Sequence, residues 1–100
     1  MTSLMVLYPS AGTRFDRDYY REHHSALVHK SWDNAGLLSL EIAYGVEALG
    51  GGASPFHLVA TLKFESREIF DAAMALPVSA TVFADIPNFT DSTPLTMVGE

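Results

Sequence analysis

The segment from Phe56 to Phe64 limits the possible folds more than any other, because its side chains alternate without interruption. One face carries only apolar residues, and the other is mixed and includes His57 and Lys63. A period of two over this length is typical of a β-strand that packs one face on a hydrophobic core. The apolar face consists of Phe56, Leu58, Ala60, Leu62 and Phe64.

Three further segments have strand character. Residues 3–9 are apolar on both faces, which predicts a strand that is covered on two sides. Residues 37–46 show the alternation of a half-buried strand, and residues 93–98 follow a turn-rich stretch and form the last predicted strand. The apolar face of the second of these segments is predicted to hold Leu38, Leu40, Ile42 and Tyr44.

Two helices are predicted between the strands. Asp16 can cap a helix that runs from about residue 17 to residue 32, and Gly36 can take the left-handed conformation that closes it. Ser66 can cap a second helix, which ends by Pro77 and carries an apolar stripe of Ile69, Phe70, Ala73 and Met74. Residues 78–85 fit either a short helix or an extended segment, since their alternation is regular but their side chains are small.

The resulting order is strand, helix, strand, strand, helix, strand, in a single domain of residues 1–100. This order predicts an α+β, ferredoxin-like fold with a four-stranded antiparallel sheet, the first and third strands in its centre and both helices on one face. The glycines at 50–52 lack the lysine and the helix of a phosphate-binding loop, so they are assigned to a hairpin. The uncovered sheet face would be apolar, which predicts a homodimer closed sheet against sheet.

Composition excludes several classes of partner and chemistry. The 100 residues carry a net charge of −6 with only six Lys and Arg, so nucleic acid and anionic membranes are not expected partners. There is no cysteine, which rules out disulfides and thiolate chemistry. The apolar N-terminal run is too short for a signal sequence or a membrane span, so a cytoplasmic protein is expected.

Three histidines lie in the first predicted helix, and they face different directions on a helical wheel. His24 lies at the centre of the apolar stripe beside Tyr20 and Val28, His29 lies on the polar side, and His23 lies at the boundary. The residues one turn after His23 and His24 are not ligands, so no metal site is predicted. No nucleophile elbow occurs either. His24 is therefore a general acid or base, or a core histidine with its ring nitrogens hydrogen-bonded.

The helical segment is similar to a known family. The stretch "FDRDYYREHHSALV", preceded by "LYPSAGTR" and followed by "ADIPNFTD", resembles the EthD-like family, which is named for ethyl tert-butyl ether degradation, within the dimeric α+β barrel superfamily. The family's usual proline after the histidine is Ala26 here. The resemblance implies a subunit whose sheet pairs with that of a partner, and a cavity into which the motif histidine projects.

The resemblance also implies roles for individual residues. His24 becomes the expected catalytic residue, and Tyr8, Tyr20 and Trp32 are expected to line the same cavity, although each could be ordinary aromatic packing. Asp85 and Asn88 are further candidates, and the competing explanation is that both bond nearby backbone. Phe83 and Phe89 are expected to wall the pocket, with simple core filling as the alternative.

Two functions remain open at the level of sequence. The first is a small cofactor-independent enzyme of isomerase, monooxygenase or decarboxylase type that acts on a hydrophobic or aromatic metabolite, with His24 moving a proton next to a carbonyl. The second is a non-catalytic protein that binds the same kind of small molecule, or an accessory protein of an oxidative degradation pathway. No sequence motif for a flavin, nicotinamide or haem is present, so no cofactor is expected.

Overall fold

The computed structural model describes residues 1–100 as one α+β unit with a four-stranded antiparallel sheet. The strands are β1 (Thr2–Pro9), β2 (Leu37–Tyr44), β3 (Phe56–Phe64) and β4 (Leu95–Gly99). The first helical segment comprises α1 (Arg17–Tyr19), η1 (Tyr20–His24), α2 (Ser25–Trp32) and the short η2 (Asp33–Ala35). The second comprises α3 (Arg67–Met74), α4 (Pro77–Ala84) and the short η3 (Ile86–Asn88).

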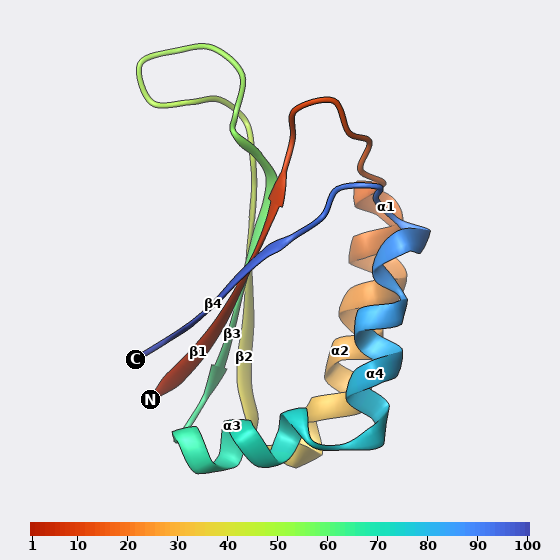
Figure 1. Ribbon diagram of the computed structural model, residues 1–100, viewed down its shortest axis with the longest axis vertical. Helices are drawn as coiled ribbons and strands as arrows, with labels where there is room; N and C mark the ends of the chain where they lie inside the picture. The colour runs from red at the N-terminus through yellow and green to blue at the C-terminus, as the bar shows by residue number, and fades with distance from the viewer.

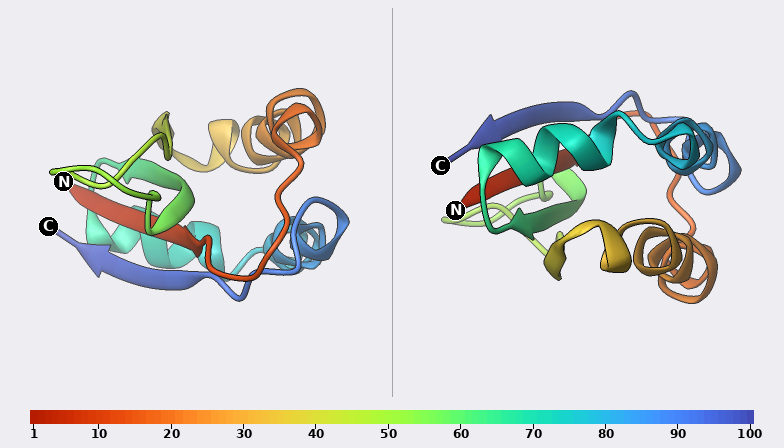
Figure 2. Two further views of the ribbon diagram at one scale, coloured as in Figure 1. Left: turned by 90° about the horizontal axis from the view of Figure 1, so that it is seen from above. Right: turned by 90° about the horizontal axis from the view of Figure 1, so that it is seen from below.

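The sheet has the strand order β2-β3-β1-β4. The two apolar strands β1 and β3 are therefore neighbours in the centre, as their sequences predict, and the ferredoxin-like fold is confirmed. Figure 1 shows the sheet nearly edge-on, with α2 and α4 running side by side along one of its faces and α3 crossing below them. The two end views in Figure 2 show α2 and α4 on that same side of the sheet, with α3 extending across the end of the strands.

The hydrophobic core lies between the sheet and the helices. Side chains of β1 and β3 alternate between buried and half-buried, so that one face of each strand enters the core. Aromatic residues supply much of its volume because each buries a large apolar surface. The largest of the fully buried side chains are Trp32, Tyr8, Tyr20, Phe64, Phe89 and Leu58.

The helix ends follow the expected capping pattern. The Asp16 side chain accepts a hydrogen bond from the Tyr19 amide, and Ser66 does the same for the amide of Ile69. Gly36 has a φ of 104°, the left-handed conformation that ends the first helical segment before β2. The ambiguous residues 78–85 are mostly helical, because Pro77 occupies the first turn of α4, where its missing amide hydrogen costs nothing.

One strand face differs from the sequence prediction. A register shift between Leu37 and Ser39 places Leu37 in the core and leaves Leu38 55% exposed. Leu38 was predicted to share the inner face with Leu40 and Ile42, and this was wrong. A bulge adds one residue to a strand, which reverses the face of every side chain before it, and simple alternation cannot detect that.

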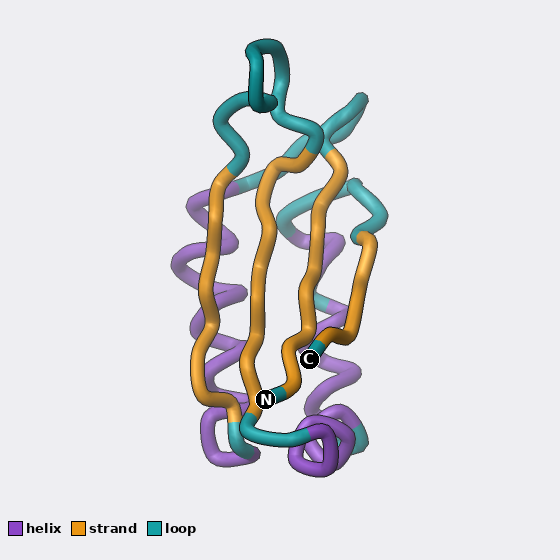
Figure 3. The backbone as a smooth tube through the Cα atoms, turned by 90° about the vertical axis from the view of Figure 1, so that its left-hand side faces the viewer, coloured by secondary structure: helices purple, strands orange, loops and turns teal.

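The sheet face opposite the helices is open, and Figure 3 views the molecule from this side. Strand register places five apolar side chains next to one another on it: Met5 lies opposite Met97, and Leu7 lies between Val59 and Leu95. We call Met5, Leu7, Val59, Leu95 and Met97 the outer patch. Leu95 and Met97 are both more than half exposed. The loop between β2 and β3 also leans toward this side (Figure 1), and its Leu49 is fully exposed.

No single helix has the length and apolar composition of a membrane span. The helix α3 and the segment from Pro77 to Asn88 meet those criteria only as a pair that is bent by 76°.

Candidate functional site

A small cavity lies between the inner face of the sheet and the helices. Its volume is about 20 Å³, which is room for about one water molecule. Ten of its twelve lining residues are buried, whereas Phe83 is 40% exposed and Ile86 is partly exposed, so these two side chains are the walls nearest to solvent. The lining residues are Leu4, Val6, Tyr8, Tyr20, His24, Val28, Trp32, Ala60, Leu62, Val82, Phe83 and Ile86.

The helix wall of the cavity is a stripe of residues four apart: Tyr20, His24, Val28 and Trp32, all buried. In a regular α-helix such a stripe drifts by about 40° with each step. Here residues Tyr20–His24 form a π-helical turn, in which the amide of Ser25 donates to the carbonyl of Tyr20. This wider turn rotates less per residue and counteracts the drift, so all four side chains face the sheet.

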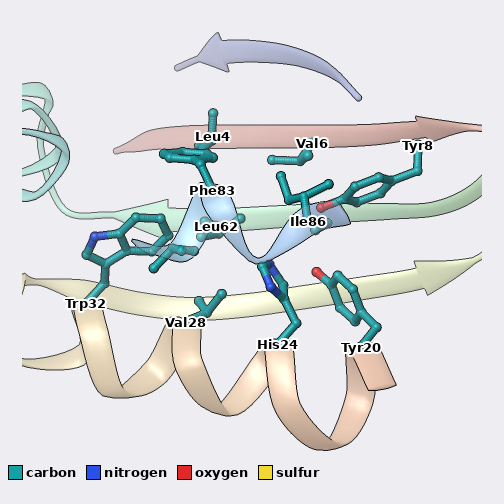
Figure 4. A pocket seen from close by; sticks show the side chains of 12 residues that line it. Leu4, Val6, Tyr8, Tyr20, His24, Val28, Trp32, Leu62, Phe83 and Ile86 are labelled. Carbon is teal, nitrogen blue, oxygen red and sulfur yellow. The ribbon is translucent and has the colours of Figure 1, made fainter. Parts of the chain in front are cut away.

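His24 is held by a carboxylate from the opposite helical segment. Its Nδ1 lies 2.9 Å from Oδ2 of Asp85, which follows α4. An ionised carboxylate only accepts hydrogen bonds, so Nδ1 carries the proton and Nε2 presents its lone pair. The ring of Phe89 packs against the imidazole with 4.7 Å between centroids and restricts its orientation. Figure 4 shows the imidazole pointing from the helix toward the cavity.

Asp85 is fixed by two further side chains. Tyr19 donates to Oδ1 through its hydroxyl at 2.7 Å, and the Asn88 amide donates to the same oxygen at 3.0 Å. Partial burial disfavours the charged form of Asp85, but the hydrogen bonds from Asn88, Tyr19 and His24 outweigh it and lower the pKa of this carboxyl. The alternative that the Asp85 and Asn88 side chains bond nearby backbone is therefore wrong, since both join this side-chain network.

His24 is neutral near physiological pH. The ring is only 4% exposed, and burial lowers its pKa below the ordinary value. The hydrogen bond and the charge of Asp85 act in the opposite direction but do not compensate fully. A buried, neutral imidazole with an oriented lone pair is suited to accept a proton from a molecule in the cavity.

Two phenols face the same part of the cavity as His24. Tyr8 comes from β1 and Tyr20 from η1, and their rings meet edge to face at 6.2 Å between centroids. Figure 4 shows both hydroxyls pointing toward the imidazole. Burial raises the pKa of both phenols well above the ordinary value, so both remain protonated donors.

The residues predicted from the sequence to form the site fall into two groups in the structure. Tyr8, Tyr20, Trp32 and Phe83 line the cavity with His24, whereas Asp85 and Phe89 lie behind the imidazole and contact it. Trp32 presents only its apolar ring, because its indole N–H donates to Ser79 Oγ at 2.9 Å.

Sequence reasoning missed Tyr19 as part of the site. Tyr19 lies in the first turn of the helix, and its partner Asp85 is 66 residues away in the chain. No local pattern links them.

No group of three or more His, Cys, Asp or Glu side chains is placed so that it could hold a metal ion. Of the other histidines, His29 pairs with Asp33 on the exposed side of α2, and His57 lies 2.8 Å from the hydroxyl of Thr13 outside the cavity.

Comparison with known proteins identifies relatives of the whole domain. The family model described as the EthD domain matches residues 9–93. An EthD-like protein from Ralstonia eutropha JMP134 is 30% identical, with a TM-score of 0.86 over 99% of this chain and 89% of that one. A protein of the ethyl tert-butyl ether degradation family from Bacillus halodurans C-125 is 23% identical, with a TM-score of 0.81 over 100% and 97%.

A more distant structure shares the fold alone. It is a dimeric ferredoxin-like protein of unknown function from Thermobifida fusca, 13% identical, with a TM-score of 0.61 over 98% of this chain and 88% of that one. Among proteins with curated functions, none matches the sequence.

Proposed function

This chain belongs to the EthD family, and we propose that it is a cofactor-independent enzyme that moves a proton at a carbon next to a carbonyl group. The substrate is a small, largely apolar molecule that enters beside Phe83. His24 is the general base and then the general acid, and Asp85 positions it and stabilises the imidazolium form.

The observation that carries this proposal is the His24–Asp85 pair at the edge of an apolar cavity. The Nδ1 proton is committed to Asp85 at 2.9 Å, which leaves Nε2 as the free basic atom. A positioned base with a pKa near the working pH contributes about 10²- to 10⁴-fold to a proton transfer. The paired carboxylate offsets the cost of forming a charged imidazolium in an apolar site.

The cavity of about 20 Å³ admits only about one water molecule or one small substrate group. Binding of a whole metabolite therefore requires that Phe83 and Ile86 move outward. Phe83 is already 40% exposed, and its ring contacts Trp32 with 6.0 Å between centroids and forms no hydrogen bond. Such a movement would widen the cavity without breaking a hydrogen bond of the His24 network.

The test is hydrogen exchange between solvent and candidate substrates. A panel of small apolar ketones and 1,3-dicarbonyl compounds is incubated with the protein in deuterated water, and deuterium uptake is measured by mass spectrometry. We expect accelerated uptake at the carbon next to the carbonyl for at least one compound, and a fall of at least about 100-fold in the variant His24→Gln. Exchange reports proton removal even where no net product forms.

The matched control is His29→Gln, which changes a histidine of the same helical segment that lies outside the cavity. It should leave the exchange rate unchanged. If compounds are retained by the protein but exchange no faster than in buffer, the chain is a binding protein and the enzymatic proposal is wrong. The same conclusion follows if His24→Gln exchanges as fast as the unmodified protein.

We also propose that two copies of the chain associate through the outer patch. The patch places five apolar side chains on an uncovered sheet face, and soluble proteins seldom leave such a contiguous surface to water. A twofold contact uses the same surface on both copies and covers both at once. The exposed ion pair of Lys63 with Glu41, at 2.7 Å, lies on the same side and would border the interface.

Sedimentation at micromolar concentration tests the dimer. The unmodified chain should sediment with twice its monomer mass. Met97→Lys should shift it toward the monomer, because it places a charge in an apolar contact. Ala72→Lys, on an exposed position of α3, is the control and should remain dimeric. A monomeric unmodified chain would exclude this assembly.

A further inference from the structure

The Tyr8 and Tyr20 hydroxyls are donors without an acceptor in the protein. The two residues are 2% and 1% exposed, and no side-chain hydrogen bond involves either hydroxyl. Neither oxygen is among the fully enclosed atoms that lack a partner, so both hydroxyls border the open space of the cavity. The polar group of Trp32, which also lines the cavity, is satisfied: its indole donates to Ser79, and Ser79 in turn donates to the carbonyl of Ala73. The buried hydroxyls of Ser25 and Ser31 also lack a partner, but these residues do not line the cavity.

Phenylalanine would fill the same space without an unpaired hydroxyl. Buried polar groups are as a rule hydrogen-bonded, and those that are not require an explanation such as a bound water or a ligand. Tyr8 and Tyr20 come from opposite walls of the cavity, and both hydroxyls lie on the side of the cavity where the His24 imidazole points (Figure 4). Two convergent donors fit a single acceptor atom, because one oxygen can accept both hydrogen bonds.

We infer that Tyr8 and Tyr20 form a two-donor site for one oxygen of the substrate, and that this oxygen is a ketone or aldehyde carbonyl that becomes an enolate during the reaction. This inference rests on the proposed function, since His24 must remove the neighbouring proton. It narrows the substrate class to apolar carbonyl compounds with an acidic C–H beside the carbonyl. Compounds that carry a carboxylate or phosphate group do not fit, because no Lys or Arg lines the cavity.

The chemical step is balanced without any further reactant. The C–H bond breaks, its proton goes to Nε2 of His24, and the electron pair moves through the new C=C bond to the carbonyl oxygen. Tyr8 and Tyr20 donate hydrogen bonds to that oxygen, and Asp85 accepts one from the imidazolium. Return of the proton to a different carbon gives an isomer. If the imidazolium first exchanges its proton with solvent, delivery to the same carbon gives hydrogen exchange without net reaction. Donors that are already in place when charge develops need no rearrangement.

Both phenols keep their protons during this step. Burial raises their pKa, so at neutral pH they donate and do not compete with His24 as bases.

The test uses binding of two probes of similar shape that differ in charge on oxygen: 4-nitrophenol, which is ionised at about pH 8, and phenol, which is neutral there. Binding of each is measured by absorbance titration or calorimetry, in the unmodified protein and in Phe83→Ala, which widens the entrance. We expect 4-nitrophenolate to bind more tightly than phenol. Tyr8→Phe and Tyr20→Phe should each weaken the binding of nitrophenolate by about 10- to 100-fold, and they should change the binding of phenol far less. Tyr44→Phe, on an exposed phenol outside the cavity, is the control.

The outcome separates this inference from the proposed function. If nitrophenolate binds no better than phenol in either background, or if the Tyr→Phe variants bind it as well as the unmodified protein, the two-donor site does not exist. His24→Gln should still bind nitrophenolate, because it leaves both phenols in place. One further outcome would overturn the oxygen site alone: His24→Gln loses deuterium exchange, but Tyr8→Phe and Tyr20→Phe bind nitrophenolate as the unmodified protein does. In that case the role of His24 as the base still holds.

Discussion

The first helical segment supplies the histidines of two histidine–carboxylate pairs that have the same N···O distance and opposite surroundings. His24 Nδ1 lies 2.9 Å from Asp85, and His29 Nδ1 lies 2.9 Å from Asp33. The side chains of the first pair are 5% and 12% exposed, whereas those of the second are 48% and 53% exposed. The first pair joins residues 61 positions apart, and the second joins neighbours on one helix.

The difference shows that the contact distance alone does not make a reactive dyad. His29 and Asp33 are one turn apart and are surrounded by water, so solvent competes for both partners and screens their charge. Asp85 is anchored by Tyr19 and Asn88, and His24 is restricted by Phe89. Burial therefore gives the first pair a fixed tautomer and a fixed direction, which the second pair lacks.

The largest expected effect comes from Asp85→Asn compared with Asp33→Asn. The amide at position 85 can no longer accept the Nδ1 proton as a charged group, so His24 loses its tautomer and the imidazolium loses its counter-charge. We expect the deuterium exchange rate to fall by about 10²- to 10⁴-fold, while Asp33→Asn leaves it unchanged. Equal rates in the two variants would mean that the buried pair has no more chemical role than the exposed one.

A smaller contrast is expected in stability. Asp85→Ala leaves His24 and Tyr19 without their acceptor, and the free energy of unfolding should fall by about 1–3 kcal/mol. Asp33→Ala removes an exposed pair and should change it by less than about 0.5 kcal/mol. Urea titration followed by circular dichroism measures both. A loss of similar size at position 33 would contradict the distinction between the two pairs.

The pH dependence gives the finest comparison. Because His24 has a lowered pKa, the folded protein binds its proton less readily than the unfolded chain does, so this residue reduces stability as pH falls below about 6.5. The exchange rate should rise with pH along the same titration, with a midpoint below about 6.5.

Asp85→Asn removes an interaction that raises the pKa of His24, so the midpoint of the exchange rate should move to still lower pH. A midpoint that moves to higher pH would show that Asp85 does not hold the imidazole. The control His29→Gln should leave the pH profile of the exchange rate unchanged.

The histidines also show how far sequence reasoning extends. The helical wheel predicts that His24 faces inward and His29 faces water, and the structure confirms both. It does not predict the π-helical turn over Tyr20–His24, since the wheel assumes one constant rotation per residue. Nor does alternation predict the bulge that turns Leu38 outward. Each irregularity inserts about one extra residue into a turn or a strand and so changes the direction of the neighbouring side chains. An insertion of this size leaves almost no trace in the composition or spacing of the sequence.

Asp85 was a candidate because of the family resemblance, and the competing explanation was local. Its position before Ile86 and Pro87 favours a turn in which the side chain bonds nearby backbone. Its carboxylate instead reaches across to His24 and Tyr19. Whether α4 packs close enough to α2 for this contact depends on the Trp32–Ser79 hydrogen bond and the aromatic packing of Phe89, not on any local pattern.

The sequence by itself determined the order of the strands and helices, their caps, the central place of β1 and β3 and the inward side of His24. These depend on periodicity and on turn chemistry, which act between residues close in the chain. Only the tertiary structure decided that Asp85, Tyr19 and Asn88 meet at His24 and that two phenols converge on one cavity. Those contacts join both helical segments and the sheet, and they are fixed by how the elements pack, which no local pattern contains.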